Sequence, residues 1–256
     1  MDTSLLPNFA IEDTLAAMLR RGALGLASTE RIAVIGPGLD FADKREGYDY
    51  YPAQTIQPFA LLEGVARLGL GNAARVRVVA FDLNPLVLEH VRHLAERARA
   101  GGTYSIQLPR ETTGNWNNPA EAYWQHFGDL IGTRAEPRPL PAGLKTVTAR
   151  AIAIQPQYAS RLSAVNLNVV AQTMDQAPGE GFDLVVATNV LVYYDLFEQA
   201  VSMASVAHMM NPRGVLLVNH TLPAQHPPAL EYLGRRSVSY SAAGAFGDDV
   251  VVYRRR

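Results

Sequence analysis

The sequence predicts an α/β fold: a seven-stranded, mostly parallel sheet with helices on both faces, a C-terminal antiparallel hairpin and an inserted cap subdomain. Ile32, Val34 and Ile35 lead directly into Gly36 and Gly38, which is typical of a buried parallel strand that ends in a tight turn. Strand-like and helix-like segments then alternate, with one interruption over 103–164. The last two strand-like segments are joined by a short Gly-rich bend, so they must pair antiparallel.

Composition indicates a self-sufficient, soluble chain. Of 256 residues, 48% are hydrophobic and 18% are charged, which is enough for a full core. The 23 basic and 24 acidic residues nearly cancel, so nucleic acid and anionic membrane are not expected partners. There is no cysteine, no export signal and no apolar run of membrane-spanning length, so we expect a cytoplasmic protein. The histidines show no metal-ligand spacing, and no metal is expected. The sequence indicates no oligomeric state.

An N-terminal extension, residues 1–30, is expected to carry a helix over 9–21, with Asn8 as its N-cap. The strand before Gly36 follows. A glycine turn of this kind can bring backbone amides close to a ligand, although a Gly-Pro-Gly turn can equally link two core elements. The connection over 41–54 is unusually long and holds Tyr48, Tyr50 and Tyr51, which either line a ligand site or anchor the loop. Thr55 is expected to cap the next helix, which ends at Gly69.

A second strand is predicted over 76–81, and Asp82 ends it. A carboxylate at this place, in a βαβ unit that began with a glycine turn, can accept hydrogen bonds from both hydroxyls of a ribose. The separation from the turn exceeds the roughly 20 residues of the simple nucleotide motif, and the long tyrosine loop accounts for the excess. Asp82 can also cap the helix that Pro85 opens. That helix runs to about residue 100, with Leu86 and Val87 facing inward.

Residues 103–164 break the alternation and are interpreted as the inserted cap, so that 31–102 and 165–256 form the main domain. The insert holds two short predicted strands, over 104–108 and 147–154, and both tryptophans, Trp116 and Trp124. Its aromatic and polar residues fit no regular core pattern, which favours a role in acceptor specificity.

After the insert, strands are predicted over 167–172, 184–187 and 215–219, and the final pair over 236–240 and 250–253. The 184–187 strand delivers Thr188, Asn189, Tyr193 and Tyr194 to the edge that carries the glycine turn. The 215–219 strand leads to His220. Residues 196–210 are expected to be helical.

The order of the glycine turn, the acid after strand two and the 182–189 and 211–219 segments resembles the class I S-adenosylmethionine-dependent methyltransferases, which have a Rossmann-like fold. The resemblance covers 31–254 without the insert. Within that family the chain is most similar to the chemotaxis-receptor methyltransferases: residues 57–60 match their Glu-Pro-Tyr-Ser stretch, and 188–194 their Arg-Asn-Val-x-Ile-Tyr-Phe stretch. The resemblance implies that Gly36, Gly38 and Asn189 contact the methionine part of S-adenosylmethionine. It also implies that Asp82 binds the ribose, and that Thr173 and Met174 contact the adenine.

The chain departs from the family pattern at several positions. The acid two places before the first glycine is Val34, the third glycine is Asp40, and the motif glutamate is Gln57. The cofactor's ammonium group would then depend on Asp40, Gln57 or backbone carbonyls. The receptor enzymes' arginine is Thr188, and their N-terminal helical domain is not matched. The resemblance therefore implies a smaller acceptor than a receptor protein.

Methyl transfer from a sulfonium needs mainly alignment of the acceptor and exclusion of water. If the acceptor must lose a proton, the candidate bases are His220, Tyr193 and Asp195, although a histidine that follows a core strand is often structural. Expected acceptor contacts are Tyr48, Tyr51, Trp124 and Tyr194. Two alternatives remain: a catalytically silent binding module, and transfer of an aminopropyl-type group from a related sulfonium. A nicotinamide dehydrogenase is disfavoured because the third glycine is missing.

Overall fold

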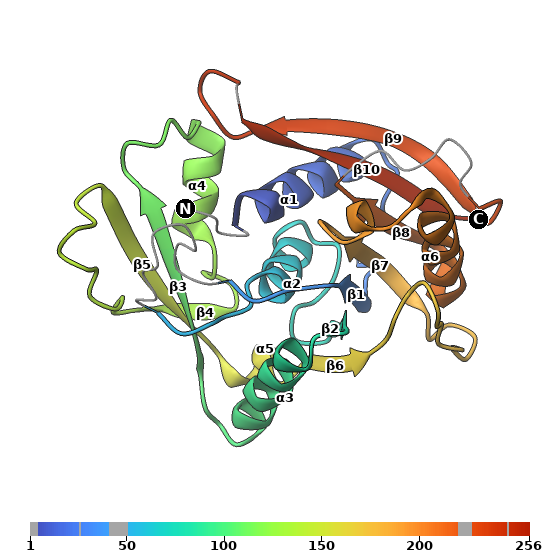
Figure 1. The fold of residues 1–256 in the computed structure, drawn as a ribbon, viewed down its shortest axis with the longest axis horizontal. Coiled ribbons are helices and arrows are strands. Elements are labelled where there is room, and N and C mark those ends of the chain that lie inside the picture. Colours follow the sequence, from blue (N-terminus) through green and yellow to red (C-terminus); the bar gives the residue numbers. More distant parts are fainter. Residues whose placement is uncertain (1–4, 26, 41–50, 220–226, 245) are drawn as a thin grey trace.

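The computed structural model describes residues 5–25, 27–40, 51–219, 227–244 and 246–256 (Figure 1). It confirms the predicted fold class. One sheet has the strand order β6-β2-β1-β7-β8-β10-β9; its first five strands are parallel, and β10 runs antiparallel to both β8 and β9. The strands are β1 (Arg31–Ile35), β2 (Arg77–Asp82), β6 (Leu162–Asn166), β7 (Phe182–Ala187), β8 (Met210–Val218), β9 (Leu230–Ser239) and β10 (Gly247–Arg255).

Alternate residues of β1 face opposite sides of the sheet, as the two-residue period of a strand requires. Ile32 and Val34 join one buried cluster with α1 (Leu5–Arg20), α2 (Gln57–Arg67) and α3 (Pro85–Arg99). Ala33 and Ile35 join the other cluster with α6 (Leu196–Met209) and the 3₁₀ turn η1 (Leu191–Tyr193). The sheet is therefore covered on both faces, and its carboxyl edge is left for other contacts.

The insert forms a second, three-stranded antiparallel sheet of order β3-β5-β4, which lies at one end of the molecule with α4 (Figure 1). Its elements are β3 (Tyr104–Glu111), α4 (Asn118–His126), β4 (Gly132–Ala135), β5 (Val147–Ile154) and α5 (Pro156–Ala159). The strand β4 was not predicted, because its four residues, Gly-Thr-Arg-Ala, carry no apolar alternation. Asn117 joins this sheet to the terminal hairpin through hydrogen bonds to the carbonyls of Tyr240 (2.8 Å) and Ser239 (2.7 Å).

The predicted third strand is wrong in position. The strand β6 spans Leu162–Asn166 and so begins inside the range expected for the insert, while 167–172 forms turns. Both segments are rich in apolar residues. The side chain of Asn168 accepts a hydrogen bond from the backbone N–H of Val170, and the Asn168 carbonyl accepts one from Gln172. An Asx turn of this kind competes with strand pairing and ends β6 before the second apolar run.

Several predicted helix ends are also corrected. Asn8 is not an N-cap: α1 begins at Leu5, so Asn8 lies inside the helix and is buried. Thr55 does not cap α2: the helix begins at Gln57, so the N-cap position falls on Ile56, and the Thr55 backbone N–H donates to the Tyr104 hydroxyl. Asn84, rather than Asp82, is the N-cap of α3. Leu86, expected to face inward, is 65% exposed.

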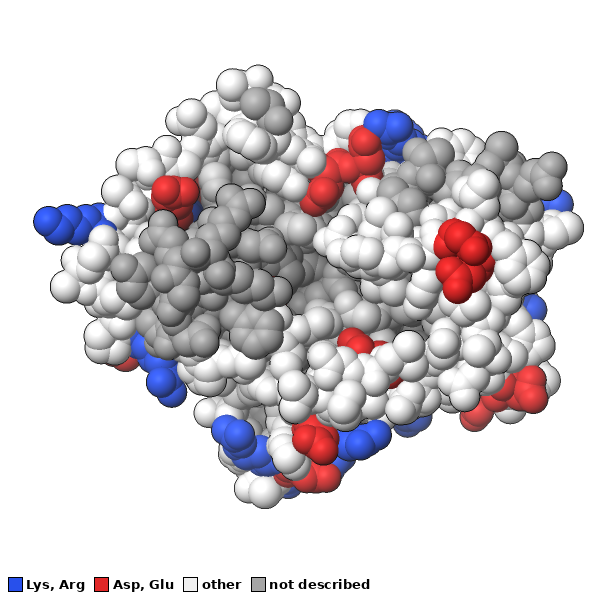
Figure 2. All heavy atoms as spheres, in the orientation of Figure 1, with Lys and Arg blue, Asp and Glu red and all other residues white. Residues whose placement is uncertain are grey.

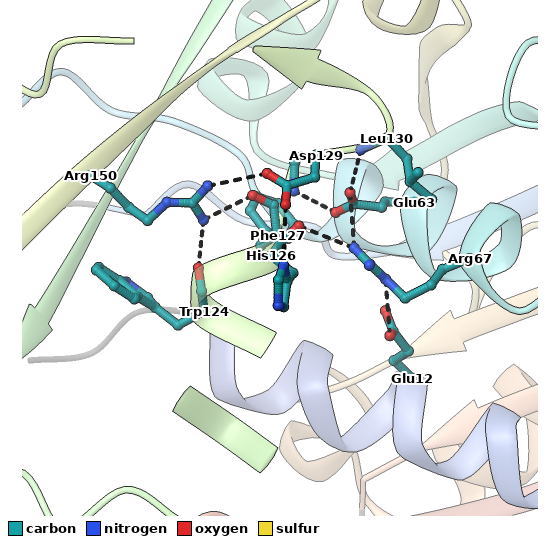
Figure 3. Close-up of polar contacts among 10 residues, drawn as sticks. Glu12, Glu63, Arg67, Trp124, His126, Phe127, Asp129, Leu130 and Arg150 are labelled. Carbon is teal, nitrogen blue, oxygen red and sulfur yellow. Dashed lines mark hydrogen bonds and ion pairs between the residues drawn. The ribbon is translucent and has the colours of Figure 1, made fainter. Parts of the chain in front are cut away.

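A buried carboxylate joins α2 to the insert (Figure 3). Glu63 is 1% exposed, and its two oxygens accept hydrogen bonds from the backbone N–H groups of Gly128 (2.6 Å) and Leu130 (3.0 Å). Arg67, one turn further along α2, pairs with Glu63 at 3.0 Å and with Glu12 of α1 at 3.5 Å. Two carboxylates thus share one guanidinium, and burial raises the pKa of both.

A second arginine holds the same loop from the other side. Arg150 of β5 donates to the carbonyls of Trp124 (2.5 Å) and Phe127 (2.9 Å), and its guanidinium lies 5.7 Å from the Trp124 ring (Figure 3). The insert is therefore fixed to the main body by charge-assisted hydrogen bonds to backbone groups. The N-terminal helix is fixed to the terminal hairpin by an ion pair between side chains, Asp13 and Arg236 at 2.5 Å. No helix within the described residues is long and apolar enough to cross a membrane.

Candidate functional site at the carboxyl edge of the sheet

The point at which the chain reverses its direction across the sheet lies beside β1. From β1 the chain proceeds outward through β2 to β6, then returns to β7 on the other side of β1. The carboxyl ends of strands at such a switch point form the crevice in which open α/β sheets bind ligands. The first glycine after β1 is held there, since the Gly36 amide donates to the Phe81 carbonyl at 2.8 Å. Gly36 and Asp82 therefore end neighbouring strands.

The two glycines of the turn differ in their surroundings. Gly36 and Gly38 have φ of +65° and +64°, a backbone conformation that favours glycine. A Cβ on Gly36 would lie 2.4 Å from the side chain of Val190, so packing within the protein explains this glycine. A Cβ on Gly38 would have no atom of the described residues within 4 Å. Of the two, Gly38 leaves its backbone open to a ligand.

A pocket of about 560 Å³ lies at this edge, within the range of small-molecule sites. Gly38 and Asp82 both line it, together with Leu39, Ala53, Asn84, Leu86, Val87 and His90. One carboxylate oxygen of Asp82 accepts from the Asn84 N–H at 2.8 Å, and the other has no partner among the described residues. The strand ends thus bring together the glycine turn and the carboxylate that the sequence predicted for one ligand.

The sequence interpretation did not assign the wall contributed by α3, including Val87 and His90. The Nε2 of His90 lies 2.8 Å from the Tyr104 hydroxyl, which accepts a hydrogen bond from the Thr55 N–H at 2.9 Å. Burial, with Arg97 and His93 nearby, lowers the pKa of His90. The neutral imidazole can therefore accept a hydrogen bond from the Tyr104 hydroxyl. This hydrogen bond joins α3 to β3 across the pocket wall. Helical spacing from the cap Asn84 could have predicted this face.

The ends of β7 and β8 supply amide and hydroxyl groups. The Gln57 side chain donates to the Thr188 hydroxyl at 2.7 Å, and both residues are buried. Asn189 has φ of +58°. Its backbone N–H donates to the Asn219 Oδ1 at 2.8 Å, and its Oδ1 accepts a hydrogen bond from the Asn219 Nδ2 at 2.5 Å. These pairs fix Thr188 and Asn189. The resemblance assigns Asn189 to the methionine part of the cofactor.

The remaining predicted ligand contacts have other partners. The Thr173 hydroxyl donates to the Ser205 carbonyl at 3.3 Å, and Met174, like Val190 and Tyr194, packs against the second core cluster. Neither Thr173 nor Met174 lines the pocket of Gly38 and Asp82. Asp40 forms a backbone bridge with Gln54. Their proposed ligand roles stay predictions.

The candidate bases and acceptor contacts are not gathered at one point. Asp195 caps α6 and forms a reciprocal capping box with Glu198, whereas Tyr193 is 82% exposed. Burial, with Glu198 and Asp82 nearby, raises the pKa of Tyr194. Tyr51 is buried. His220 and Tyr48 lie outside the described residues.

Trp124 is held away from the pocket by contacts within the insert. Its indole N–H donates to the Leu108 carbonyl at 3.1 Å, and its ring lies between the guanidinium groups of Arg110 and Arg150. It lines a separate surface hollow formed by the insert. Among the described residues, no group of three His, Asp or Glu side chains is placed to hold a metal ion.

No protein-family model and no curated protein matches the chain. The chain aligns with the solved structure of the N-methyltransferase NodS from Bradyrhizobium japonicum WM9, at 12% identity over 95% of this chain and 96% of that one, with a TM-score of 0.44. It aligns with the mitomycin 7-O-methyltransferase MmcR at 14% identity over 99% of this chain and 54% of that one, with a TM-score of 0.46. It aligns with the magnesium protoporphyrin IX methyltransferase ChlM from Synechocystis PCC 6803, solved with bound SAM, at 11% identity over 97% of this chain and 79% of that one, with a TM-score of 0.41. Identities and scores this low do not bear on activity, which must be argued from the site.

Proposed function

We propose that the chain is an S-adenosylmethionine-dependent methyltransferase that acts on a small-molecule acceptor. The supporting observation is the pocket at the switch point, which Gly38 and Asp82 line together. Asp82 keeps one carboxylate oxygen free for a ribose hydroxyl, while Asn84 fixes the other. Gly38 offers an open backbone at the adjoining turn. A carboxylate for the ribose beside a close backbone approach is a recurring arrangement for binding adenosine-bearing ligands.

The sheet supports this proposal over a nicotinamide dehydrogenase. The dinucleotide-binding fold has six parallel strands in the order 3-2-1-4-5-6. Here an antiparallel strand, β10, lies between β8 and β9. Phe41 stands where the dinucleotide motif has its third glycine. Both differences agree with the resemblance stated from the sequence.

In the proposed reaction the sulfonium supplies an electrophilic methyl group, so the protein's main contribution is position. Asp82 would hold the ribose, and the loop fixed by Asn189 and Asn219 would lie toward the methionine end. Gln57 and Thr188 satisfy each other's polar groups below that loop. The loop can therefore keep one geometry while the acceptor is aligned and water is excluded.

The acceptor is proposed to be small and partly apolar. Around Asp195, the N-cap of α6, three large apolar side chains are exposed at the same edge. Their exposed fractions are 82% for Tyr193, 69% for Leu196 and 75% for Phe197. On the face drawn in Figure 2, the Lys and Arg side chains of the described residues lie toward the periphery and form no band across the central hollow. Thr188 is buried where the receptor enzymes' motif has arginine, which argues against a receptor glutamate as the acceptor.

Calorimetric titration with S-adenosylhomocysteine tests the proposal. The Asp82→Asn variant keeps the oxygen that accepts from Asn84 but removes the charge, and we expect its affinity to fall by about tenfold or more. The matched control is Glu96→Gln, which removes a carboxylate from the exposed side of α3 and should bind like the wild type. Failure of folded wild type to bind either S-adenosylhomocysteine or S-adenosylmethionine would favour the silent module. Preference for a decarboxylated sulfonium would favour aminopropyl transfer.

A further inference from the structure

A row of arginines lies at the opposite, amino edge of the sheet. Arg31 and Arg77 are the first residues of β1 and β2 and are register partners. Arg161 immediately precedes β6, whose Leu162 pairs with Val78, and the Val78 amide donates to the Arg161 carbonyl at 3.1 Å. An arginine therefore stands at the amino end of each of three adjacent parallel strands, as the first residue of β1 and β2 and as the residue before β6. Neighbouring strands are about 4.8 Å apart, so three positive side chains stand side by side.

The positive charges of these arginines are only partly balanced by neighbouring carboxylates. Arg31, Arg75, Arg77 and Arg161 line one hollow of about 440 Å³ with Glu30 and Glu180. Within the described part of the chain, none of these four guanidinium groups lies within 4.0 Å of a carboxylate. Asp183, whose carboxylate accepts hydrogen bonds from the backbone N–H groups of Glu30 and Arg31, is a third negative group at this edge. Four positive and three negative groups leave a net charge of +1. Like charges placed directly opposite one another destabilise a sheet, so the row costs stability unless an anion binds.

One arginine of the row is held in place before any ligand arrives. The guanidinium of Arg31 lies 5.2 Å from the Phe182 ring centroid and donates to the Gln176 side chain at 3.4 Å. The Nε2 of Gln176 is buried and has no hydrogen-bond partner among the described residues. Phe182 and Gln176 therefore hold the Arg31 guanidinium in one position beside the hollow.

We propose that the hollow lined by these arginines binds a phosphate-bearing small molecule. Guanidinium groups recognise phosphate oxygens with paired, charge-assisted hydrogen bonds. Four guanidinium groups that have no carboxylate within 4.0 Å among the described residues suit a multiply charged anion, and 440 Å³ suits a ligand of nucleotide size or smaller. Nucleic acid is disfavoured because the chain as a whole carries a net charge of −1 and has no long-range attraction for a polyanion.

This site is separate from the pocket of the proposed function. The two lie at opposite ends of β1, whose five residues span roughly 17 Å. A ligand at the amino edge would therefore not touch a group bound at Gly38 and Asp82. The inference does not depend on methyl transfer, and each proposal can fail without the other.

Titration of the full chain with pyrophosphate at constant ionic strength tests the inference. We expect binding to the wild type and a loss of about tenfold or more in Arg77→Gln, which removes the central charge of the row. The control Arg99→Gln, at the exposed end of α3, should bind like the wild type, and so should Asp82→Asn. Arg161→Gln, outside the strands, provides a second variant if Arg77→Gln does not fold.

Two results would overturn the inference. The first is wild-type binding of pyrophosphate no tighter than that of Arg77→Gln and Arg161→Gln. The second is Arg77-dependent binding of a single-stranded oligonucleotide that is tighter than binding of pyrophosphate, which would identify nucleic acid as the occupant. Thermal unfolding provides an independent readout: pyrophosphate should raise the melting temperature of the wild type and leave that of Arg77→Gln nearly unchanged.

Discussion

Neutralising Glu12 should stabilise the protein above neutral pH and have little effect in acid. Burial raises the pKa of Glu12 to about 7; Arg67 opposes the shift, and Glu63 adds to it. Only 16% of the side chain is exposed. The folded state therefore binds a proton that the unfolded chain has lost, and stability falls as the pH rises from about 4.5 to 7. Above pH 7 the buried charge costs its full amount.

The size of this effect follows from the shift itself. Each pKa unit corresponds to about 1.4 kcal/mol, so a carboxyl raised from 4.5 to about 7 destabilises the folded state by at most about 3 kcal/mol. Relaxation of the network around Arg67 reduces this. We expect Glu12→Gln to gain about 1 to 2 kcal/mol relative to the wild type between pH 5 and pH 8.

Urea unfolding followed by the fluorescence of Trp116 and Trp124 measures this difference at both pH values. Glu96→Gln, an exposed carboxylate on α3, serves as the control and should show no pH-dependent gain. Histidines titrate in both proteins and cancel in the comparison. An unfolding free-energy difference between Glu12→Gln and wild type that is the same at pH 5 and pH 8 would refute the assignment of a raised pKa to Glu12.

Four further substitutions test the glycine turn and the insert. Gly36→Ala should lose about 2 to 5 kcal/mol of unfolding free energy and Gly38→Ala about 1 to 2 kcal/mol, because only the first adds a clash with Val190 to an unfavourable φ. Adding Val190→Ala to Gly36→Ala should recover part of the larger loss. Equal losses for the two glycine variants in urea unfolding would contradict this account. Trp124→Ala should lose about 2 kcal/mol through its contacts with Arg110 and Arg150, with unchanged S-adenosylhomocysteine affinity. Acceptor turnover that also stays unchanged per folded molecule would exclude Trp124 from acceptor recognition.

The main sheet could be predicted because its strands carry strong local signals. The apolar residues before Gly36 and the short bend before β10 specify a strand end and an antiparallel return without knowledge of distant contacts. The third strand could not be located in this way. Two successive apolar runs, around Val165 and Val169, competed for the same place beside β2, and the turn formed by Asn168 decided between them. Side-chain hydrogen bonds of this kind are hard to rank from sequence alone.

The candidate pocket was partly predictable for a similar reason. Gly38 and Asp82 each follow a strand, and parallel strands bring their carboxyl ends to one edge. Trp124 illustrates the limit. Its position depends on Arg110 and Arg150, which come from β3 and β5 of the inserted sheet, and on the Leu108 carbonyl. Nothing in the local sequence indicates that these partners would turn the indole away from the main sheet.

The pairing of Asp13 with Arg236 joins residues that are 223 positions apart. During synthesis the first helix leaves the ribosome early, but its partner strand is made last. At 5 to 20 residues per second this interval lasts roughly 10 to 45 s. Throughout that time the side of α1 that packs on β9 and β10 has no native surface to cover it, although α2 and α4 are already present for its other contacts. A nascent chain arrested before the terminal hairpin should therefore expose that helix to chaperones and proteases.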